Sequence, residues 1–369
     1  MQQEQLVESI NQLLLDALAK RASDIHFEPY QHSYRIRMRI DGVLQDMTSP
    51  PLTLAKQIAA RLKIMAKLNI AEQRLPQDGQ LVIDHYAMRI STLPVINGEK
   101  IVLRVMDNHE SQLAITDLGF TAQDLTTFQQ ILNYPQGLIL VTGPTGSGKT
   151  MTLYSGLKIL NQTDRNICSV EDPIEIPLEG INQTPVNLKA GLTFSIILRA
   201  FLRQDPDIMM IGEIRDKETA EIAIQAAQTG HLILSTLHTN SSIEAITRLN
   251  QMGIENYLLA SSIKLIIAQR LVRKLCPHCK VVANELIKLE QEVIPHFIAM
   301  GCNHCIGGYQ GRIGLYEFLV ITPEIQQQIL NHQVITPINM ISLQNAGKNL
   351  VKQGMTSLAE LHRVLGDFR

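Results

Sequence analysis

The chain has 369 residues, of which 45% are hydrophobic and 18% are charged, and its formal net charge is −2. This length and composition predict a globular protein of two or three domains. The near-neutral charge argues against nucleic acid as the main partner, and no apolar run approaches the roughly 18 residues that a membrane-spanning helix needs. The N-terminus also lacks the basic start and apolar core of a secretory signal.

The first part of the chain mixes helical spacing of apolar residues with strict strand-like alternation, as in the segment YRIRMRI at 34–40. The expected elements are helices over 5–22 and 52–68, and strands over 34–40, 80–84, 86–92 and 100–106. Residues 1–107 are therefore predicted to form a small α+β domain, and the polar segment 108–117 is predicted to be a linker.

A different pattern occupies residues 118–275, where short, fully apolar runs alternate with helical segments. Strands that are apolar on both faces and separated by helices predict a parallel sheet covered on both sides. The runs lie at 138–141, 167–170, 208–211 and 232–237. Residues 276–311 follow with four cysteines and a Gly-rich turn, and residues 312–369 are predicted to be a C-terminal helical region.

Residues 143–150 match the phosphate-binding pattern G-x-x-x-x-G-K-[ST]. A buried strand precedes the loop and a helix follows it, as the motif requires, which argues against a chance match by a Gly-rich turn. The backbone amides and the helix N-terminus would bind phosphate, Lys149 would reach the β- and γ-phosphates of ATP, and Thr150 would bind Mg²⁺. The nucleotide-binding residues are Gly143, Pro144, Thr145, Gly146, Ser147, Gly148, Lys149 and Thr150.

Polar side chains follow three of the buried runs. Residues 171–175 place three carboxylates at the carboxyl end of a strand, where parallel sheets bind ligands, and this favours Mg²⁺ binding or water positioning over a solvated turn. Glu213 ends another run and is placed to polarise the attacking water, although Gly212 replaces the usual strand-end aspartate. His238 follows a third run, and this position favours sensing of the γ-phosphate over a core role.

Four of the five cysteines form two Cys-x-x-Cys pairs, Cys276 with Cys279 and Cys302 with Cys305. In a reducing compartment this spacing predicts a closed, tetrahedral, structural Zn²⁺ site, with free thiols and a redox switch as alternatives. Cys168 lies in an apolar run and is predicted to be a buried, inert thiol.

Together the motifs resemble those of the secretion ATPase superfamily, in particular the motors of type II secretion and type IV pilus assembly (GspE and PilB types). Besides the phosphate loop and the cysteine pairs, the resemblance rests on 21–29 (RASDIHFEP), 74–79 (RLPQDG), 171–175 (EDPIE), 191–194 (GLTF), 198–207, 212–216 (GEIRD), 230–240, 268–273 (AQRLVR) and 311–317 (GRIGLYE). The implied fold is α/β: a RecA-like P-loop NTPase core with a parallel sheet, preceded by a small PAS-like domain and followed by a zinc module and helices.

The resemblance also implies roles for particular residues. They are an Asp box (Glu171, Asp172, Glu175), a Walker B glutamate (Glu213), a His box (His231, His238), arginines that act across a subunit interface (Arg89, Arg104), and arginines near the nucleotide of their own subunit (Arg199, Arg203). Without the resemblance, Arg89 and Arg104 would be read as surface charges on strands.

Members of this superfamily are cytoplasmic homohexamers that dock beneath a platform protein of the inner membrane. The expected cofactors are ATP, Mg²⁺ and Zn²⁺, and membrane association is expected to be peripheral and through partners, with no direct binding of nucleic acid. The chain is expected to be a short form without the additional N-terminal domain of many members, which leaves its adaptor open.

Two alternatives to an assembly motor remain. A pilus retraction or conjugation motor is disfavoured by the four cysteines together with the GEIRD and STLHTN segments. An ATP-binding zinc-ribbon protein that binds nucleic acid is disfavoured by the neutral charge and by the lack of an aromatic-basic stripe. Stimulation of ATP hydrolysis by DNA is expected for that last class alone.

Overall fold

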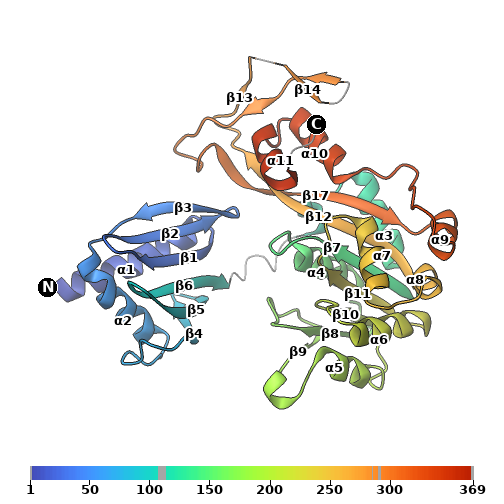
Figure 1. The fold of residues 1–369 in the computed structure, drawn as a ribbon, viewed down its shortest axis with the longest axis horizontal. Coiled ribbons are helices and arrows are strands. Elements are labelled where there is room, and N and C mark those ends of the chain that lie inside the picture. Colours follow the sequence, from blue (N-terminus) through green and yellow to red (C-terminus); the bar gives the residue numbers. More distant parts are fainter. Residues whose placement is uncertain (1, 107–113, 285, 290–291, 367–369) are drawn as a thin grey trace. The chain divides into compact units, whose positions relative to one another are not determined.

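The computed structural model describes every residue except 1, 107–113, 285, 290–291 and 367–369. The chain divides into two compact units, Met1–His109 and Glu110–Arg369, which are described separately (Figure 1). Most of the predicted linker, 108–117, lies outside the described residues, and its last residues begin the short 3-10 helix Ile115–Leu118.

The first unit is an antiparallel six-stranded sheet, in the order β3-β2-β1-β6-β5-β4, with two helices packed against its apolar face (Figure 1). Its elements are α1 (Gln2–Ala19), β1 (Ala22–Pro29), β2 (Tyr34–Ile40), β3 (Val43–Thr48), the 3-10 helix Leu52–Leu54, α2 (Ala55–Met65), β4 (Gln77–Ile83), β5 (Tyr86–Val95) and β6 (Gly98–Met106). Alternate residues of β2 are buried, as the strict alternation predicts.

Both helices of this unit end earlier than the apolar spacing indicates. Arg21 and Lys67 adopt positive φ angles of 55° and 56°, which stop α1 and α2. Apolar periodicity continues past these points because the following residues also face the core, as in Ala22 of β1. Periodicity therefore located the helices but not their last turns.

The second unit is built on a seven-stranded sheet in the order β17-β12-β7-β11-β10-β8-β9. All neighbouring strands are parallel except β12 and β17, which are antiparallel. The strands of this sheet are β7 (Gly137–Thr142), β8 (Ile167–Glu171), β9 (Asn182–Pro185), β10 (Ile208–Ile211), β11 (Leu232–Leu237), β12 (Ile263–Leu275) and β17 (Tyr309–Val320).

Helices cover both faces of this sheet (Figure 1), so that two apolar cores lie on its opposite sides. The helices are α3 (Ala122–Leu132), α4 (Lys149–Leu160), α5 (Phe194–Phe201), α6 (Lys217–Gln228), α7 (Ser242–Gln251), α8 (Asn256–Ser262), α9 (Pro323–Leu330), α10 (Leu343–Lys352) and α11 (Leu358–Leu365), with a 3-10 turn at Leu188–Ala190. The four predicted apolar runs are β7, β8, β10 and β11, each buried along its whole length. The predicted parallel sheet covered on both sides is confirmed.

The C-terminal part differs from the prediction in one respect. The expected boundary between 276–311 and a helical region at 312–369 falls inside β17, which pairs with β12 along most of its length. Three helices, α9 to α11, follow β17. The segment between β12 and β17 contains the cysteines and short strands: β13 (Val281–Val282), β14 (Ile287–Leu289), β15 (Glu292–Ile294) and β16 (Phe297–Ile298).

Candidate functional site

The phosphate loop connects the end of β7 to the start of α4, so its amides lie at the carboxyl edge of the sheet and at a helix N-terminus. Gly146 and Gly148 have φ angles of 78° and 85°, a conformation that glycine adopts without steric cost. A side chain at Gly143 would not fit, because its Cβ would lie 2.4 Å from the carbonyl oxygen of Gln269. The backbone is therefore shaped to wrap an anion.

Lys149 is folded into this loop. Its side chain is buried, and Nζ donates to the carbonyl oxygens of Gly143 at 2.8 Å and Pro144 at 3.2 Å. Burial lowers the pKa of Lys149 to about 8. The hydroxyl of Ser147 is also buried and makes no hydrogen bond within the described residues. A buried cation and an unused hydroxyl fit the oxygens of a triphosphate.

Glu213 follows β10 at the carboxyl edge of the sheet. It lies close enough to the phosphate loop for its charge to act on Lys149. One carboxylate oxygen accepts a hydrogen bond from Nη2 of Arg215 at 2.5 Å, and the other lies 3.3 Å from Nε2 of His238. Burial by itself would raise the pKa of Glu213, but the hydrogen bond and charge of Arg215 outweigh it and lower that pKa. Burial and the charge of Lys149 lower the pKa of His238. An ionised carboxylate therefore faces a neutral histidine near pH 7.

Glu171 differs from Glu213 in that its carboxylate is buried and hydrogen-bonded by three side chains. It is buried beneath the site at the end of β8, and its oxygens accept hydrogen bonds from Tyr154 Oη, from Ser169 Oγ at 2.6 Å and from Gln183 Nε2 at 3.0 Å. These three donors make the carboxylate a buried link between α4, β8 and β9, and its catalytic role stays a prediction.

The other two acidic residues of this segment are exposed and border the site. The charge of Glu175 acts on Lys149, and the charge of Asp172 acts on Arg215. Both carboxylates therefore act electrostatically on groups of the site, and their role as an Asp box stays a prediction.

Three further predicted residues are not brought to the phosphate loop. His231 precedes β11 at the amino end of the sheet, where Nδ1 lies 3.1 Å from the carbonyl oxygen of Ala226, whereas His238 lies at the carboxyl end. Arg199 and Arg203 lie on and just after α5. Arg199 pairs with Glu218 of α6 at 3.1 Å, and Arg203 donates to the carbonyl oxygen of Arg199. The two histidines flank β11, so they lie at opposite ends of the strand, as the sequence indicates.

Arg89 and Arg104 belong to the first unit. They lie directly opposite each other on β5 and β6, and both are exposed. Arg104 Nε pairs with Asp24 of β1 at 3.0 Å, whereas Arg89 has no hydrogen bond or ion pair within the described part of the chain.

Sequence reasoning missed Arg270, which is buried on β12 next to the phosphate loop. Its burial lowers its pKa, and its charge contributes to the lowered pKa of Lys149. The available signal was an arginine within the otherwise apolar run 265–272, because a charged residue is rarely buried without a reason.

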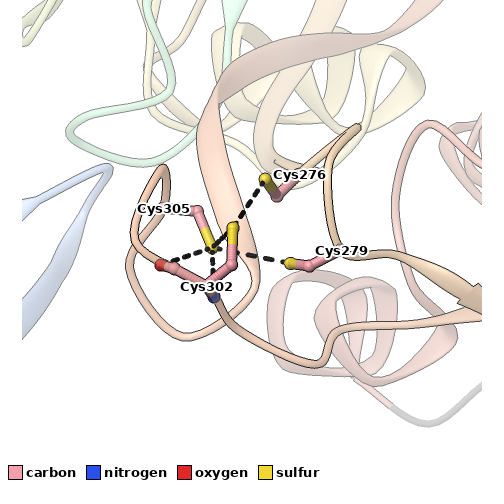
Figure 2. A group of neighbouring side chains, drawn as sticks. All are labelled: Cys276, Cys279, Cys302 and Cys305. Carbon is pink, nitrogen blue, oxygen red and sulfur yellow. Dashed lines mark hydrogen bonds between the residues drawn. The ribbon is translucent and has the colours of Figure 1, made fainter.

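The four paired cysteines converge from two turns, with their sulfurs all within 4.8 Å of one another (Figure 2). The Sγ–Sγ distances are 3.8 Å for Cys276–Cys302 and 3.7 Å for both Cys279–Cys305 and Cys302–Cys305. A tetrahedron with Zn–S bonds of about 2.3 Å has edges of about 3.8 Å, so the cluster fits zinc. His278 and His304 stack on each other with ring centroids 4.5 Å apart and are not part of the cluster. Cys168 is buried in β8, as predicted.

Comparisons with known proteins agree with this picture. The family described as type II/IV secretion system protein matches residues 1–363. The type IV pilus assembly ATPase PilB of Acinetobacter baylyi is 48% identical over 98% of this chain and 66% of its own length. The type II secretion system ATPase E of Vibrio cholerae is 44% identical over 97% of this chain and 75% of its own length.

Among solved structures, the ATPase DotB of Legionella pneumophila has a TM-score of 0.73 at 20% identity and covers 96% of this chain, with 94% of its own chain matched, which shows a shared fold. The chain spans about two thirds of the length of the pilus assembly relative. Within the described residues, none of the helices is both long and apolar enough to span a membrane.

Proposed function

Because the chain belongs to the family of type II/IV secretion system proteins, we propose that it is a hexameric motor ATPase that drives assembly of a type IV pilus or a type II secretion pseudopilus. The observation that carries this proposal is the grouping of Lys149, Glu213 and His238 at the carboxyl edge of the parallel sheet. Ligands bind at this edge in parallel α/β folds.

Hydrolysis follows from the roles that these groups can take. The loop amides and Lys149 stabilise negative charge on the transferred phosphoryl group, and ionised Glu213 orients the attacking water. His238, neutral near pH 7, keeps the second oxygen of Glu213 in position. Mg²⁺, when bound, neutralises phosphate charge, and the hydroxyl of Thr150 would hold it.

The active site is completed by a neighbouring subunit of the ring. Arg89 and Arg104 belong to a compact unit separate from the phosphate loop, and their guanidinium groups are exposed. Guanidinium groups remain charged at any working pH and bind phosphate oxygens through two donors. Their role is to stabilise charge at the nucleotide of the adjacent chain.

The cysteine cluster is a structural zinc site. All four ligand positions of a tetrahedron are filled by sulfur, which leaves no position for a substrate. The ring acts at the cytoplasmic face of the inner membrane, beneath a platform protein and without direct contact with nucleic acid; the resemblance to assembly motors supports this part of the proposal.

The test uses the full chain with Mg²⁺ and ATP. Glu213→Gln should bind ATP but lose at least about a hundredfold in kcat, because the charge that orients water is gone. Glu221→Gln removes the charge of an exposed carboxylate on α6; it is the matched control and should retain the parent rate. Hydrolysis by Glu213→Gln at the parent rate would show that the assigned role is wrong.

An experiment in cells tests whether the motor drives assembly or retraction. Loss of an assembly motor should abolish surface pili or secretion, whereas loss of a retraction motor should leave excess pili on the surface. The second outcome would reject assembly and favour the retraction alternative.

A further inference from the structure

Arg270 lies where the central sheet meets the phosphate loop. β12 pairs in parallel with β7 as far as Ala268 opposite Thr142, and beyond that point the phosphate loop leaves the sheet alongside β12. The guanidinium of Arg270 consequently packs against the first residue of the loop: Nη1 lies 3.3 Å from the position that a Cβ on Gly143 would occupy.

The guanidinium is buried and hydrogen-bonded only to neutral oxygens. Only 8% of Arg270 is exposed. Nη1 donates to the carbonyl oxygen of Gln269 at 2.9 Å, and Nη2 donates to the backbone oxygen of Asn240 at 3.0 Å and to its Oδ1 at 3.3 Å. No carboxylate in the described part of the chain forms an ion pair with it.

Two carboxylates act on Arg270 from farther away, and both are engaged elsewhere. Glu317 accepts hydrogen bonds from the backbone and hydroxyl of Ser242 and from the backbone of Leu343, and Glu244 accepts one from the backbone of Asn240. A buried charge that lacks a contacting counter-charge destabilises the folded chain. This cost to folding indicates that the buried charge of Arg270 serves a role other than stability.

The phosphate loop indicates what this role is. Arg270 and Lys149 are both buried cations at the loop, and each contacts Gly143. The charge of Arg270 also lowers the pKa of Lys149, which means that the two groups repel each other. An anion bound in the loop offsets both charges, and the triphosphate of ATP is such an anion.

Arg270 is also tied to the loop that carries His238. Its partner Asn240 follows Thr239, whose backbone amide donates to Thr142 Oγ1 at 2.8 Å, immediately before the phosphate loop. His238, which directly precedes Thr239, faces Glu213. Hydrogen bonds thus join the segment that carries His238 to Arg270, through Asn240, and to Thr142, the residue before the phosphate loop, through Thr239.

We propose that Arg270 is a positioning residue of the nucleotide site, which adds a second buried positive charge in cis for the triphosphate and, through Asn240, holds the His238 loop in place for hydrolysis. The inference rests on ATP binding at the phosphate loop, as proposed above. It accounts for the burial of an arginine that forms no ion pair with any of the described residues.

The first experiment compares stability with affinity in a Glu213→Gln background, where bound ATP persists. Arg270→Gln should raise the Kd for Mg·ATP by at least about tenfold, since hydrogen bonds and charge near phosphate are lost. Without nucleotide its Tm should equal or exceed that of the parent, because a destabilising buried charge is removed. Arg312→Gln, an exposed arginine on neighbouring β17, is the control and should change neither quantity.

A purely structural Arg270 predicts the opposite pair of results: a lower Tm without nucleotide and an unchanged Kd. Either of these in Arg270→Gln would overturn the proposal. Lys149→Ala is measured in parallel, because retained ATP binding in that variant would instead refute the nucleotide site itself.

Arg270→Lys keeps the charge but loses the two-point bond to Asn240, and it remains informative if Arg270→Gln fails to fold. Its Kd for Mg·ATP should stay within about threefold of the parent, while kcat, measured with Glu213 intact, should fall at least about tenfold. Loss of ATP affinity in Arg270→Lys, or a kcat equal to that of the parent, would contradict the proposal.

Discussion

Tyr154, on the helix that follows the phosphate loop, donates its hydroxyl to the buried carboxylate of Glu171. Tyr154→Phe should lower the free energy of unfolding by about 1–3 kcal/mol, because a buried charged acceptor loses a donor, and should leave kcat close to that of the parent. Tyr134→Phe is the matched control, since Tyr134 is 46% exposed, and should change neither. Denaturant unfolding and ATPase assays measure the two quantities. A large loss of kcat at unchanged stability would indicate that Glu171 has a catalytic role.

Arg215 pairs with Glu213 and favours the ionised form of its carboxylate. Its hydrogen bond and charge lower the pKa of Glu213 against the effect of burial, so the carboxylate remains the active, ionised form to lower pH. Arg215→Gln should raise that pKa and move the acid limb of the pH profile of kcat/KM to higher pH, whereas Arg215→Lys should move it less. The opposite shift, or no shift, would rule out this coupling.

His238 complicates this profile, because Arg215 also lowers its pKa. The same profiles measured in a His238→Gln background separate the two groups. If the acid limb and its displacement by Arg215→Gln persist there, the limb belongs to Glu213; their disappearance would assign it to His238.

Among single residues, those whose role depends on local backbone geometry could be predicted from the sequence. Lys149 and the loop glycines are fixed by the strand, turn and helix that surround them in the chain. Glu171 and Arg270 owe their surroundings to Gln183 and Asn240, which lie in other segments. These hydrogen-bond partners could not be read from the motifs that contain Glu171 and Arg270.

At the scale of elements, the cysteine turns join β12 and β17 to the C-terminal helices. The backbone amide of Cys276 donates to Gly308, that of Leu275 to Met355, and Lys280 Nζ to the carbonyl oxygen of Gly354. A metal that holds the two turns together therefore also fixes the connection that leads into α11.

Cys279→Ser should consequently lose zinc and destabilise more than its own turn. Closed four-thiolate sites contribute folding free energy directly. Elemental analysis should find one zinc per chain in the parent and in the control Cys168→Ala, and less in Cys279→Ser. Amide exchange should accelerate over 276–311 and at the start of α11, with the phosphate loop unaffected. Parent protein without zinc and with four reactive thiols would refute the site.

β17 is one of several strands that were not predicted from the sequence. Its sequence contains Gly311, Gly314 and the charged residue Glu317, which interrupt the apolar pattern of a buried strand. The strand forms because β12 supplies a long antiparallel partner and because Glu317 is satisfied by Ser242 and Leu343. Both reasons are long-range, whereas β7, β8, β10 and β11 are mostly apolar, short runs that were recognisable by themselves.

The whole chain combines a nucleotide-binding unit with a unit whose open sheet face is rich in arginine. On that face Glu28 accepts two hydrogen bonds from Arg37, and Asp24 pairs with Arg104, so these charges are balanced within the unit. Arg89 is not balanced in this way by any described residue. Two arginines opposite each other on adjacent strands repel, which favours a site where a neighbouring chain supplies negative charge.

Mixed rings test this shared site. Chains with Lys149→Ala lack a working phosphate loop, and chains with Arg89→Ala plus Arg104→Ala lack the arginines, so each should be nearly inactive alone. In random equal mixtures about a quarter of the interfaces join an intact loop to intact arginines, and activity should return to a comparable fraction of the parent value. Mixing Lys149→Ala chains with chains that carry all three substitutions is the control and should restore nothing. Because Arg104 also neutralises Asp24, unfolding of the double arginine variant is measured first. No recovery in rings shown to be mixed, or full activity of the folded double variant alone, would refute the shared site.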